Sequence, residues 1–398
     1  DRSQPARILE LDPSAEDARL LRSVLFFPED TRDVYVGDPA IRHYLDEAEG
    51  RFLQSLKSFL NSPSFERTEI RRQSWKLEDL VALLLRRIRE QVEKLAGGAI
   101  ERVVLGRPAV FDPDPERDRL AETRLARAAQ VAGFPAPTFV IEPIAAALSY
   151  EASLSHDETV LVGDFGAGTS DFTLMSLGPS RRADADRRKD VLGASGVRIG
   201  GDRFDAAIVE HRLLKWFGEG ATYLALTKQV ELPRWLTRKL LAWHELSVLR
   251  ERSTLEFLRN AEATSDTPEP VGNLIRLVEE NLAYHLYRSV EVTKRRLSAA
   301  EEAPLSFHHG GIDIEERVTR AEFEAWTAPL REQLMASVDE CLRQGNGAMP
   351  DAVFLTGGTS RIPSVRQLFA ERFGEERLRE GDAFTSVASG LGRAASQG

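Results

Sequence analysis

Hydrophobic and polar residues alternate along the first part of the chain in patterns that predict both strands and helices. Apolar stretches from Arg7 to Leu11 and from Ser23 to Phe27, each closed by a proline-containing acidic turn, predict short strands. From Leu77 to Leu95, apolar residues recur every three or four positions, which predicts an amphipathic helix. We then expect a strand at Arg102 to Leu105, a helix through Ala129, a strand at Thr138 to Ile141 and a helix at Pro143 to Tyr150. This order indicates an α/β fold class.

Two further apolar stretches, from Thr159 to Phe165 and from Ser170 to Leu177, predict the strands of a hairpin with a glycine-rich tip. The charged run from Arg181 to Asp190 predicts an exposed loop. The elements expected after it are a turn at Gly200-Gly201, a helix from Phe204 to Phe217, a long helical region from Leu232 to Ala299, a strand from Ala352 to Thr356, a turn at Gly357-Gly358 and a helix from Val365 to Phe373.

The length and composition add limits to this picture. A chain of 398 residues exceeds one ordinary core, so we expect two lobes. The formal net charge of -10 argues against nucleic acid as the main partner. The single cysteine, Cys341, suits a reducing cytoplasm and is expected to be a buried apolar residue on a helix. No apolar run is long enough to span a bilayer, so we expect no membrane partner.

The tip of the predicted hairpin has the features of a phosphate site. Asp164 ends an apolar strand, and the side-chain-poor tip that follows lets backbone N–H groups approach an anion. Asp164 and Asp171 could hold Mg²⁺ or its water shell, because Mg²⁺ prefers a few carboxylates and several waters. The tip itself consists of Gly166, Ala167, Gly168 and Thr169. A plain hairpin with a glycine turn would give the same short pattern, so the alternative stays open.

Three other segments carry candidate chemistry. Glu142 precedes a proline at a strand-to-helix junction, where it could orient an attacking water or simply cap the helix. A second segment places Glu291, Lys294, Arg295 and Ser298 on one helical face, which is also typical of a solvated surface. The third segment contains a double-glycine turn, which allows backbone contact with a ribose or phosphate, and Arg361, which can cover an adenine ring. An ordinary strand-to-helix turn is the alternative interpretation of this segment. Its residues are Gly357, Gly358, Thr359 and Arg361.

Taken together, these motifs resemble the nucleotide-binding domain of DnaK-type 70-kDa heat-shock chaperones, and most closely its short YegD-like branch. The hairpin resembles the second phosphate motif of that family, and the segment from Val353 to Pro363 resembles its adenosine motif. Glu142 to Ala147 resembles the first connecting helix, and Ser386 to Gly390 resembles the second, with small residues where two helices cross. The resemblance implies an actin-like ATPase (ribonuclease H-like) fold with two lobes around a nucleotide cleft.

The resemblance also implies site residues. It assigns Mg-ATP or ADP as ligand, with Asp164 and Asp171 holding Mg²⁺ through water. Residues expected to order the water and the metal are Glu142, Asp164, Thr169 and Asp171. Residues expected to bind the nucleotide are Gly166, Ala167, Gly168, Thr169, Gly200, Gly201, Glu291, Lys294, Arg295, Ser298, Gly357, Gly358, Thr359 and Arg361. Within that set, Glu291 and Lys294 would meet the ribose, Arg295 would stack on the base and Ser298 would bond its edge.

The resemblance further suggests domain limits: lobe I at residues 1–157, with an outer part at about 25–99, and lobe II at 158–398, with an outer part at about 202–317. We expect no peptide-binding domain after the last motif, and we expect the sequence to begin after the first phosphate hairpin of the family. Two departures bear on catalysis. Ile41 stands where we expect the family's catalytic lysine, with Lys57 the nearby cation of unknown placement, and Ala167 replaces a tip glycine.

The leading hypothesis from the sequence is therefore a cytoplasmic Mg-dependent ATPase domain of a DnaK-like chaperone, in which lobe closure follows the nucleotide and unidentified clients or cochaperones are partners. Ile41 and Ala167 favour a second interpretation, a nucleotide-dependent interaction module that does not hydrolyse ATP. An actin-like filament protein and a sugar kinase of the same superfold are further alternatives, because the fold alone does not fix the function.

Overall fold

The computed structural model describes residues 7–47, 49–182, 187–381 and 385–397. The chain divides into two compact units, each treated by itself below. Unit 1 comprises Asp1–Arg198, Leu334–Ser360 and Val365–Gly398, and unit 2 comprises Ile199–Gln333 and Arg361–Ser364. Across the described ranges, none of the helices combines the length and the apolar character that crossing a membrane requires.

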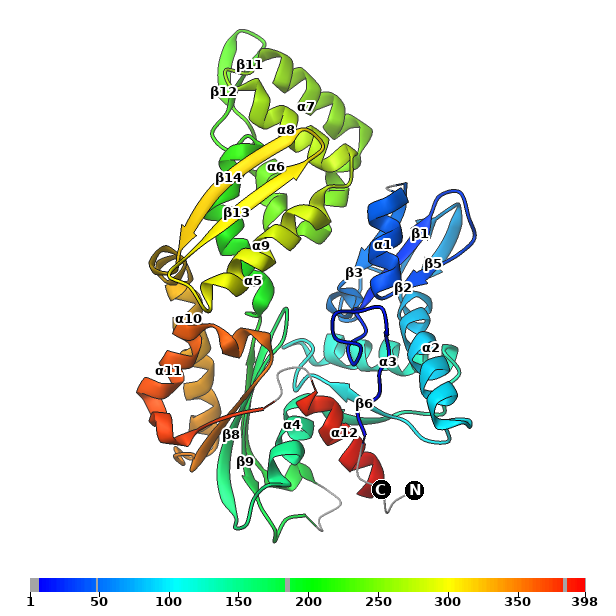
Figure 1. The fold of residues 1–398 in the computed structure, drawn as a ribbon, viewed down its shortest axis with the longest axis vertical. Coiled ribbons are helices and arrows are strands. Elements are labelled where there is room, and N and C mark those ends of the chain that lie inside the picture. The colour runs from blue at the N-terminus through cyan, green and yellow to red at the C-terminus, as the bar shows by residue number, and fades with distance from the viewer. Residues whose placement is uncertain (1–6, 48, 183–186, 382–384, 398) are drawn as a thin grey trace. The chain divides into compact units, whose positions relative to one another are not determined.

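A five-stranded sheet forms the centre of unit 1, in the order β10-β9-β8-β15-β16. Figure 1 labels its strands β8 and β9. Strands β8 and β9 are antiparallel, whereas β15 runs parallel to both β8 and β16. The bounds are β8 (Glu158–Phe165), β9 (Ser170–Leu177), β10 (Val191–Val197), β15 (Ala352–Thr356) and β16 (Leu378–Glu380). The predicted hairpin and the strand before the double glycine are thus confirmed, and they are neighbours in one sheet.

Helices cover both faces of this sheet. Figure 1 shows α4 (Glu142–Glu151) on one side and α11 (Pro363–Phe373) on the other. Val160 and Val162 of β8 pack with the apolar side of α4, whereas the rings of Phe165 and Phe369 meet on the α11 side with centroids 5.8 Å apart. Because side chains alternate between the faces of a strand, Asp164 shares the α4 face with Val160 and Val162.

Helices α4 and α12 (Ser386–Gln397) cross at very small residues. Ala145, Ala146 and Ala147 are fully buried, and a Cβ atom added to Gly390 would lie 1.6 Å from the carbonyl oxygen of Ala145. The two backbones are therefore in direct contact. This confirms the sequence-based expectation that small residues mark a helix crossing at these two segments.

Replacing Gly390 by alanine should therefore destabilise the protein, although alanine favours helix formation. The added methyl group has to displace the α4 backbone, and overpacking of this kind costs about 1–3 kcal/mol. Urea unfolding of Gly390→Ala should show the loss, whereas Gly98→Ala adds a methyl group with no atom within 4 Å and should be close to neutral. Equal stability of the two variants would contradict the direct backbone contact.

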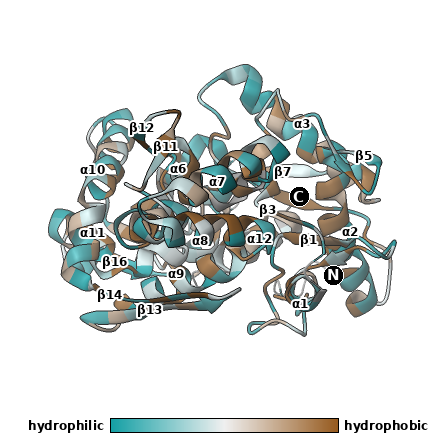
Figure 2. Ribbon diagram, turned by 90° about the horizontal axis from the view of Figure 1, so that it is seen from above, coloured by the Kyte–Doolittle hydropathy of each residue, from teal (hydrophilic) through white to brown (hydrophobic). Residues whose placement is uncertain are grey.

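The rest of unit 1 contains smaller sheets and the helices that cover them. One sheet has the order β2-β1-β3, β4 and β5 form a hairpin, and β6 pairs with β7 in parallel across the connecting helix α3. Their bounds are β1 (Val24–Pro28), β2 (Tyr35–Val36), α1 (Asp38–Glu47), β3 (Gly50–Gln54), β4 (Arg67–Ile70), β5 (Gln73–Lys76), α2 (Leu77–Ala96), β6 (Val104–Arg107), α3 (Pro115–Val131) and β7 (Thr138–Ile141). Leu77, Leu80 and Val81 of α2 join Ala121 and Ala128 of α3 in one core. Figure 2 shows α2 coloured by the hydropathy of its residues.

Unit 2 combines helices with two hairpins. The hairpins are β11 (Thr222–Ala225) with β12 (Lys228–Glu231) and β13 (Glu302–His309) with β14 (Ile312–Thr319). The helices are α5 (Gly201–Ile208), α6 (Arg234–Arg238), α7 (Arg252–Thr264), α8 (Pro268–Glu279), α9 (Ala283–Leu297) and the first part of α10 (Arg320–Gln344). Helix α9 packs along β13, where Thr293 donates to the Pro304 carbonyl at 2.9 Å. In unit 1, the second part of α10 carries Cys341, which is fully buried as predicted.

Three predictions from the pattern need correction. The strand expected at Arg7 to Leu11 is absent from the described residues, because the N–H groups of Leu11 and Asp12 donate to Ala18 and close a loop instead. The helix expected at Phe204 to Phe217 is three successive pieces, since α5 is followed by a π-helical turn and a 3-10 turn. The hairpins of unit 2 had no counterpart in the prediction.

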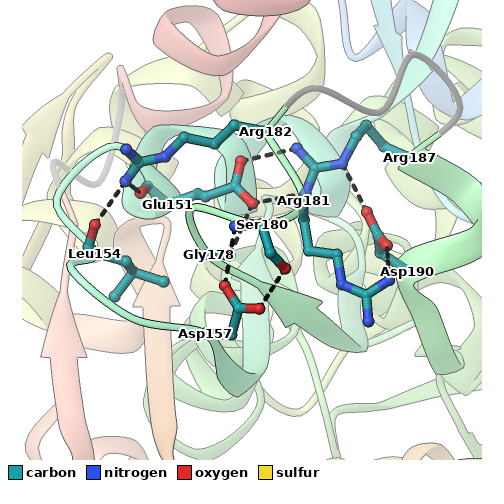
Figure 3. Close-up of polar contacts among 9 residues, drawn as sticks. All are labelled: Glu151, Leu154, Asp157, Gly178, Ser180, Arg181, Arg182, Arg187 and Asp190. Carbon is teal, nitrogen blue, oxygen red and sulfur yellow. Dashed lines mark hydrogen bonds and ion pairs between the residues drawn. The ribbon is translucent and has the colours of Figure 1, made fainter.

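The third correction concerns the charged run, whose residues 183–186 lie outside the described part of the chain. Arg181, Arg182, Arg188 and Lys189 are exposed as predicted, but Arg187 is only 7% exposed and forms a bidentate pair with Glu151 at 2.7 and 2.8 Å. Asp190, 2% exposed, accepts from the same guanidinium at 2.7 Å (Figure 3). Arg182 donates to the carbonyls of Glu151 and Leu154, closing the end of α4. Mutual pairing therefore makes burial of these charges possible.

Candidate functional site

Two carboxylates face each other at the tip of the β8–β9 hairpin in unit 1. Asp164 and Asp171 are directly opposite in the strand register, so both project to the α4 side of the sheet. Asp171 is 6% exposed, and the Thr169 hydroxyl donates to it at 3.2 Å. Like charges at opposite positions of a strand pair repel, so this arrangement favours a counter-ion or a shared proton.

The electrostatics of the pair follow from this placement. Burial, reinforced by the charges of Glu142 and Asp171, raises the pKa of Asp164 to about 7, although Lys57 opposes the shift. Burial and the charge of Glu142 raise the pKa of Asp171 to about 6, against the hydrogen bond from Thr169 and the charge of Lys57. Two carboxyl groups that titrate so close to neutrality are typical of functional sites.

Glu142 and Lys57 complete the charged cluster. Glu142 starts α4, and its Oε1 lies 2.7 Å from the ammonium of Lys57. Gly106 at the end of β6 leaves room for this carboxylate, since a Cβ atom there would lie 3.0 Å from the Glu142 Cγ. Unit 1 thus brings together three carboxylates and one ammonium from four segments of the sequence.

Ile41 and Lys57, the two residues that the sequence raised for a catalytic cation, lie in different surroundings. Ile41 is 8% exposed on α1 and belongs to the apolar interior, so it says nothing about the charge of the site. Lys57 lies on a one-turn 3-10 helix, η1 (Leu56–Phe59), and its ammonium contacts Glu142. A single lysine in a short turn has no periodic signal, so its proximity to Glu142 could not be derived from spacing.

The backbone around the carboxylates is open on one side and tightly packed on the other. A Cβ atom at Gly168 or Gly358 would have no neighbour within 4 Å, and Ala167 is exposed. Gly357 has φ +90°, and a Cβ atom there would lie 2.1 Å from the carbonyl oxygen of Phe165. The double-glycine turn therefore lies directly against the end of β8, and the parallel pairing of Thr356 with Asp164 explains why.

The remaining predicted residues of these two turns take different positions. Gly166 donates its N–H to the carbonyl of Thr169 at 2.9 Å and so closes the hairpin tip. Thr359 is 5% exposed within the short helix η7 (Gly358–Arg361), and Arg361, which unit 2 includes, is exposed.

In unit 2, the predicted helical face exists but its lysine already has a partner. The Lys294 ammonium lies 2.8 Å from the Asp205 carboxylate and 3.4 Å from the Gly201 carbonyl oxygen. Asp205 was not among the predicted site residues, although it lies in the glycine-rich segment at the start of α5. Gly200 is the N-cap of that helix.

The other members of the face are more accessible. Glu291 pairs with Arg288 at 2.9 Å, Arg295 is exposed, and Ser298 is the C-cap of α9. Glu291, Lys294 and Arg295 therefore follow one helix as predicted, with Ser298 at its end. Their contacts with a nucleotide stay a prediction.

The donor set can be tested against a magnesium ion. No cluster of three or more His, Cys, Asp or Glu side chains suited to a metal occurs in the described ranges. Two facing carboxylates nevertheless fit Mg²⁺, which usually binds one or two carboxylates and keeps waters and phosphate oxygens as its other ligands. A divalent cation would also relieve the repulsion between Asp164 and Asp171.

The fold and these side chains define an α/β protein with a carboxylate-lined, glycine-rich hairpin suited to phosphate and metal. The model of the family described as Hsp70 protein matches residues 18–262 and 274–398. The chain therefore belongs to the Hsp70 family, and its fold is that of the actin-like ATPases. This confirms the expected family and fold.

Individual relatives agree with the family match. The chain is 25% identical to the chaperone protein DnaK of Thermosipho melanesiensis and 26% identical to that of Thermosipho africanus, in both cases over 97% of this chain and 55% of the relative. The DnaK protein of Thermotoga neapolitana is 25% identical with the same coverage. The chain thus spans 55% of the length of these curated relatives. These matches support an ATP-binding, DnaK-like domain, while the YegD-like branch stays a prediction.

Proposed function

We propose that the chain binds Mg-ATP and hydrolyses it by in-line attack of water. The observation that carries this proposal is the cluster in unit 1, where the facing Asp164 and Asp171 lie with Glu142 and Lys57 at one end of the sheet. Phosphoryl transfer needs little besides positioning and charge stabilisation, and this cluster offers both.

Each residue of unit 1 has a role in the proposal. Asp164 and Asp171 would hold Mg²⁺, which when bound neutralises phosphate charge. Glu142 would orient the attacking water and accept its proton, and Lys57 would stabilise the charge that develops on the transferring phosphoryl group. The backbone N–H groups of Ala167, Gly168 and Thr169 and of the double-glycine turn would cradle phosphate oxygens, whereas the Gly166 N–H already donates to the Thr169 carbonyl.

The adenosine roles belong to the segments of unit 2. Arg295 and Arg361 would cover the base, and Ser298 would bond its edge. Glu291 and Lys294 would meet the ribose. Because Lys294 already contacts Asp205 and Gly201, it would reach a ribose with only part of its donor capacity. Gly200 and Gly201 would approach the phosphates through their backbone.

Chaperone activity is a proposal at a coarser level. The curated relatives carry the name chaperone protein DnaK, and clients or cochaperones would be the protein partners if this chain acts within such a system. Nothing in the cluster of unit 1 identifies them.

Single-turnover hydrolysis of ATP tests the proposed chemistry. We expect wild-type protein to convert bound ATP to ADP in the presence of Mg²⁺, and we expect Asp164→Asn to abolish hydrolysis with ADP affinity nearly unchanged. Equal turnover of the two proteins would exclude the assigned role of Asp164. Tight ATP binding without turnover in wild type would support the non-hydrolysing module instead.

A further inference from the structure

The turn that carries Lys57 is short and begins in a strained conformation. Helix η1 has only the residues Leu56–Phe59. The residue before it, Ser55, has φ 54° and ψ 31°, the left-handed region that non-glycine residues rarely adopt. Such a conformation persists only where the surroundings determine it. Neighbouring groups must therefore hold this turn in place.

One buried guanidinium donates hydrogen bonds to three backbone carbonyl groups at the C-terminal end of the turn. The Nη1 atom of Arg124 lies 2.8 Å from the Ser62 oxygen, 3.1 Å from the Leu60 oxygen and 3.4 Å from the Phe59 oxygen. Arg124 is 7% exposed, and its Nε lies 3.7 Å from the Glu78 carboxylate. The Phe59 and Ser62 carbonyls also accept backbone N–H groups, from Ser62 at 3.0 Å and from Phe65 at 3.3 Å, so the charged guanidinium adds a further donor to each.

The donor is itself fixed in place. Arg124 belongs to α3 and Glu78 to the first turn of α2, and these two helices share a buried core. Asn61 forms a second attachment next to that of Arg124. Its side-chain amide donates to the Asp112 carboxylate at 2.9 Å and to the Phe111 carbonyl at 3.2 Å. The turn is therefore attached at its C-terminal end to α3 through Arg124 and to the segment before α3 through Asn61.

This attachment matters because the side chain of Lys57 is held weakly at its outer end. The side chain is 55% exposed, and its ammonium meets Glu142 at the surface of unit 1. An exposed ion pair contributes little by itself to fixing a long side chain. The position of the ammonium therefore depends on where the backbone of η1 places it.

We propose that Arg124 is a positioning residue for Lys57: through the carbonyls of Phe59, Leu60 and Ser62 it fixes the turn that points the ammonium at Glu142. The inference rests on the proposed function for its consequence in catalysis. Removing the guanidinium should displace Lys57, and misplacement by about 1 Å can cost as much as 100-fold in rate.

The kinetic test compares three variants. Arg124→Ala should lower kcat about 10- to 100-fold with KM for ATP within about twofold, because the nucleotide contacts are retained. Arg124→Lys keeps the charge but cannot reach the same carbonyls, so an intermediate kcat is expected. Added guanidinium chloride at millimolar concentration should restore part of the kcat of Arg124→Ala. Arg127→Ala, an exposed arginine one turn further along α3, is the matched control and should keep full activity.

Two measurements separate positioning from a general structural role. In a Lys57→Met background, Arg124→Ala should cause no further loss of kcat, since the positioned group is already gone. In nucleotide-free protein with ¹³C-methylated lysines, the Lys57 signal, assigned by Lys57→Arg, should move in Arg124→Ala while the other lysine signals stay. An unmoved Lys57 signal, or an equal loss of kcat in the Lys57→Met background, would overturn the inference.

The failure of the proposed function would look different. If wild type shows no turnover, or if Lys57→Met keeps full turnover, the catalytic role of Lys57 is wrong, and the lysine signal still decides whether Arg124 positions it. If Arg124→Ala does not fold, the signal in Arg124→Lys decides.

Discussion

Replacing Lys57 by methionine is expected to lower kcat for ATP hydrolysis about 100- to 1,000-fold, which is the usual effect of removing one donor that stabilises transition-state charge. Methionine keeps the length and the apolar stem of lysine but has no ammonium. Since the ammonium meets Glu142 at 2.7 Å and lies on the exposed side of the cluster, folding should hardly change. KM for ATP should stay within a few-fold, because the loss falls mainly on the transition state.

The matched control is Lys94→Met, which removes an exposed lysine from the last turn of α2. It should keep wild-type kcat. Steady-state kinetics at saturating ATP and Mg²⁺ measure both variants. A kcat for Lys57→Met equal to that of the control would show that the ammonium takes no part in hydrolysis.

A second large effect is expected on stability. Asp164→Asn should stabilise the nucleotide-free protein at pH 8, and much less at pH 4. The folded-state pKa of Asp164, about 7, lies above its ordinary value of 3.8, so the folded protein holds the proton over this interval while the unfolded chain releases it. The free energy of unfolding therefore falls as the pH rises from about 4 to 7. Three pKa units correspond to at most about 4 kcal/mol, which the asparagine variant should regain.

Urea unfolding with EDTA at the two pH values measures this difference. Asp46→Asn, at an exposed position on α1, is the control and should not show it. Asp164→Asn is also expected to abolish hydrolysis. Removing one carboxylate would then raise the stability and remove the activity, as is common at functional sites. The gain in the free energy of unfolding of Asp164→Asn over wild type should be larger at pH 8 than at pH 4. An equal gain at both pH values would show that the pKa of Asp164 is not raised in the folded protein.

Much of the fold could be predicted because it depends on local patterns. The apolar stretches of β8 and β9 on either side of a glycine-rich tip gave the hairpin, and the alternation of side chains along a strand then places Asp164 and Asp171 on one face. The three- and four-residue period of α2 and the spacing of Glu291, Lys294 and Arg295 gave helical faces that the structure contains. The crossing of α4 and α12 followed from the small residues together with the resemblance of the two segments to the connecting helices of the family.

The parts that could not be predicted depend on contacts between distant segments. Lys57 and Glu142 are 85 positions apart and meet through a one-turn helix with no periodic signal. Charge runs predict exposure, yet Arg187 and Asp190 are buried because Glu151, from another element, completes their pairing. Likewise, spacing placed Lys294 on the right face but could not show that Asp205 already holds it.

A crystal structure with Mg²⁺ and a non-hydrolysable ATP analogue tests the central claim most directly. The account predicts a metal whose waters contact Asp164 and Asp171, with the terminal phosphate between the hairpin tip and the Lys57 ammonium. A nucleotide bound with its phosphates away from this cluster, or a metal held by other residues, would contradict it.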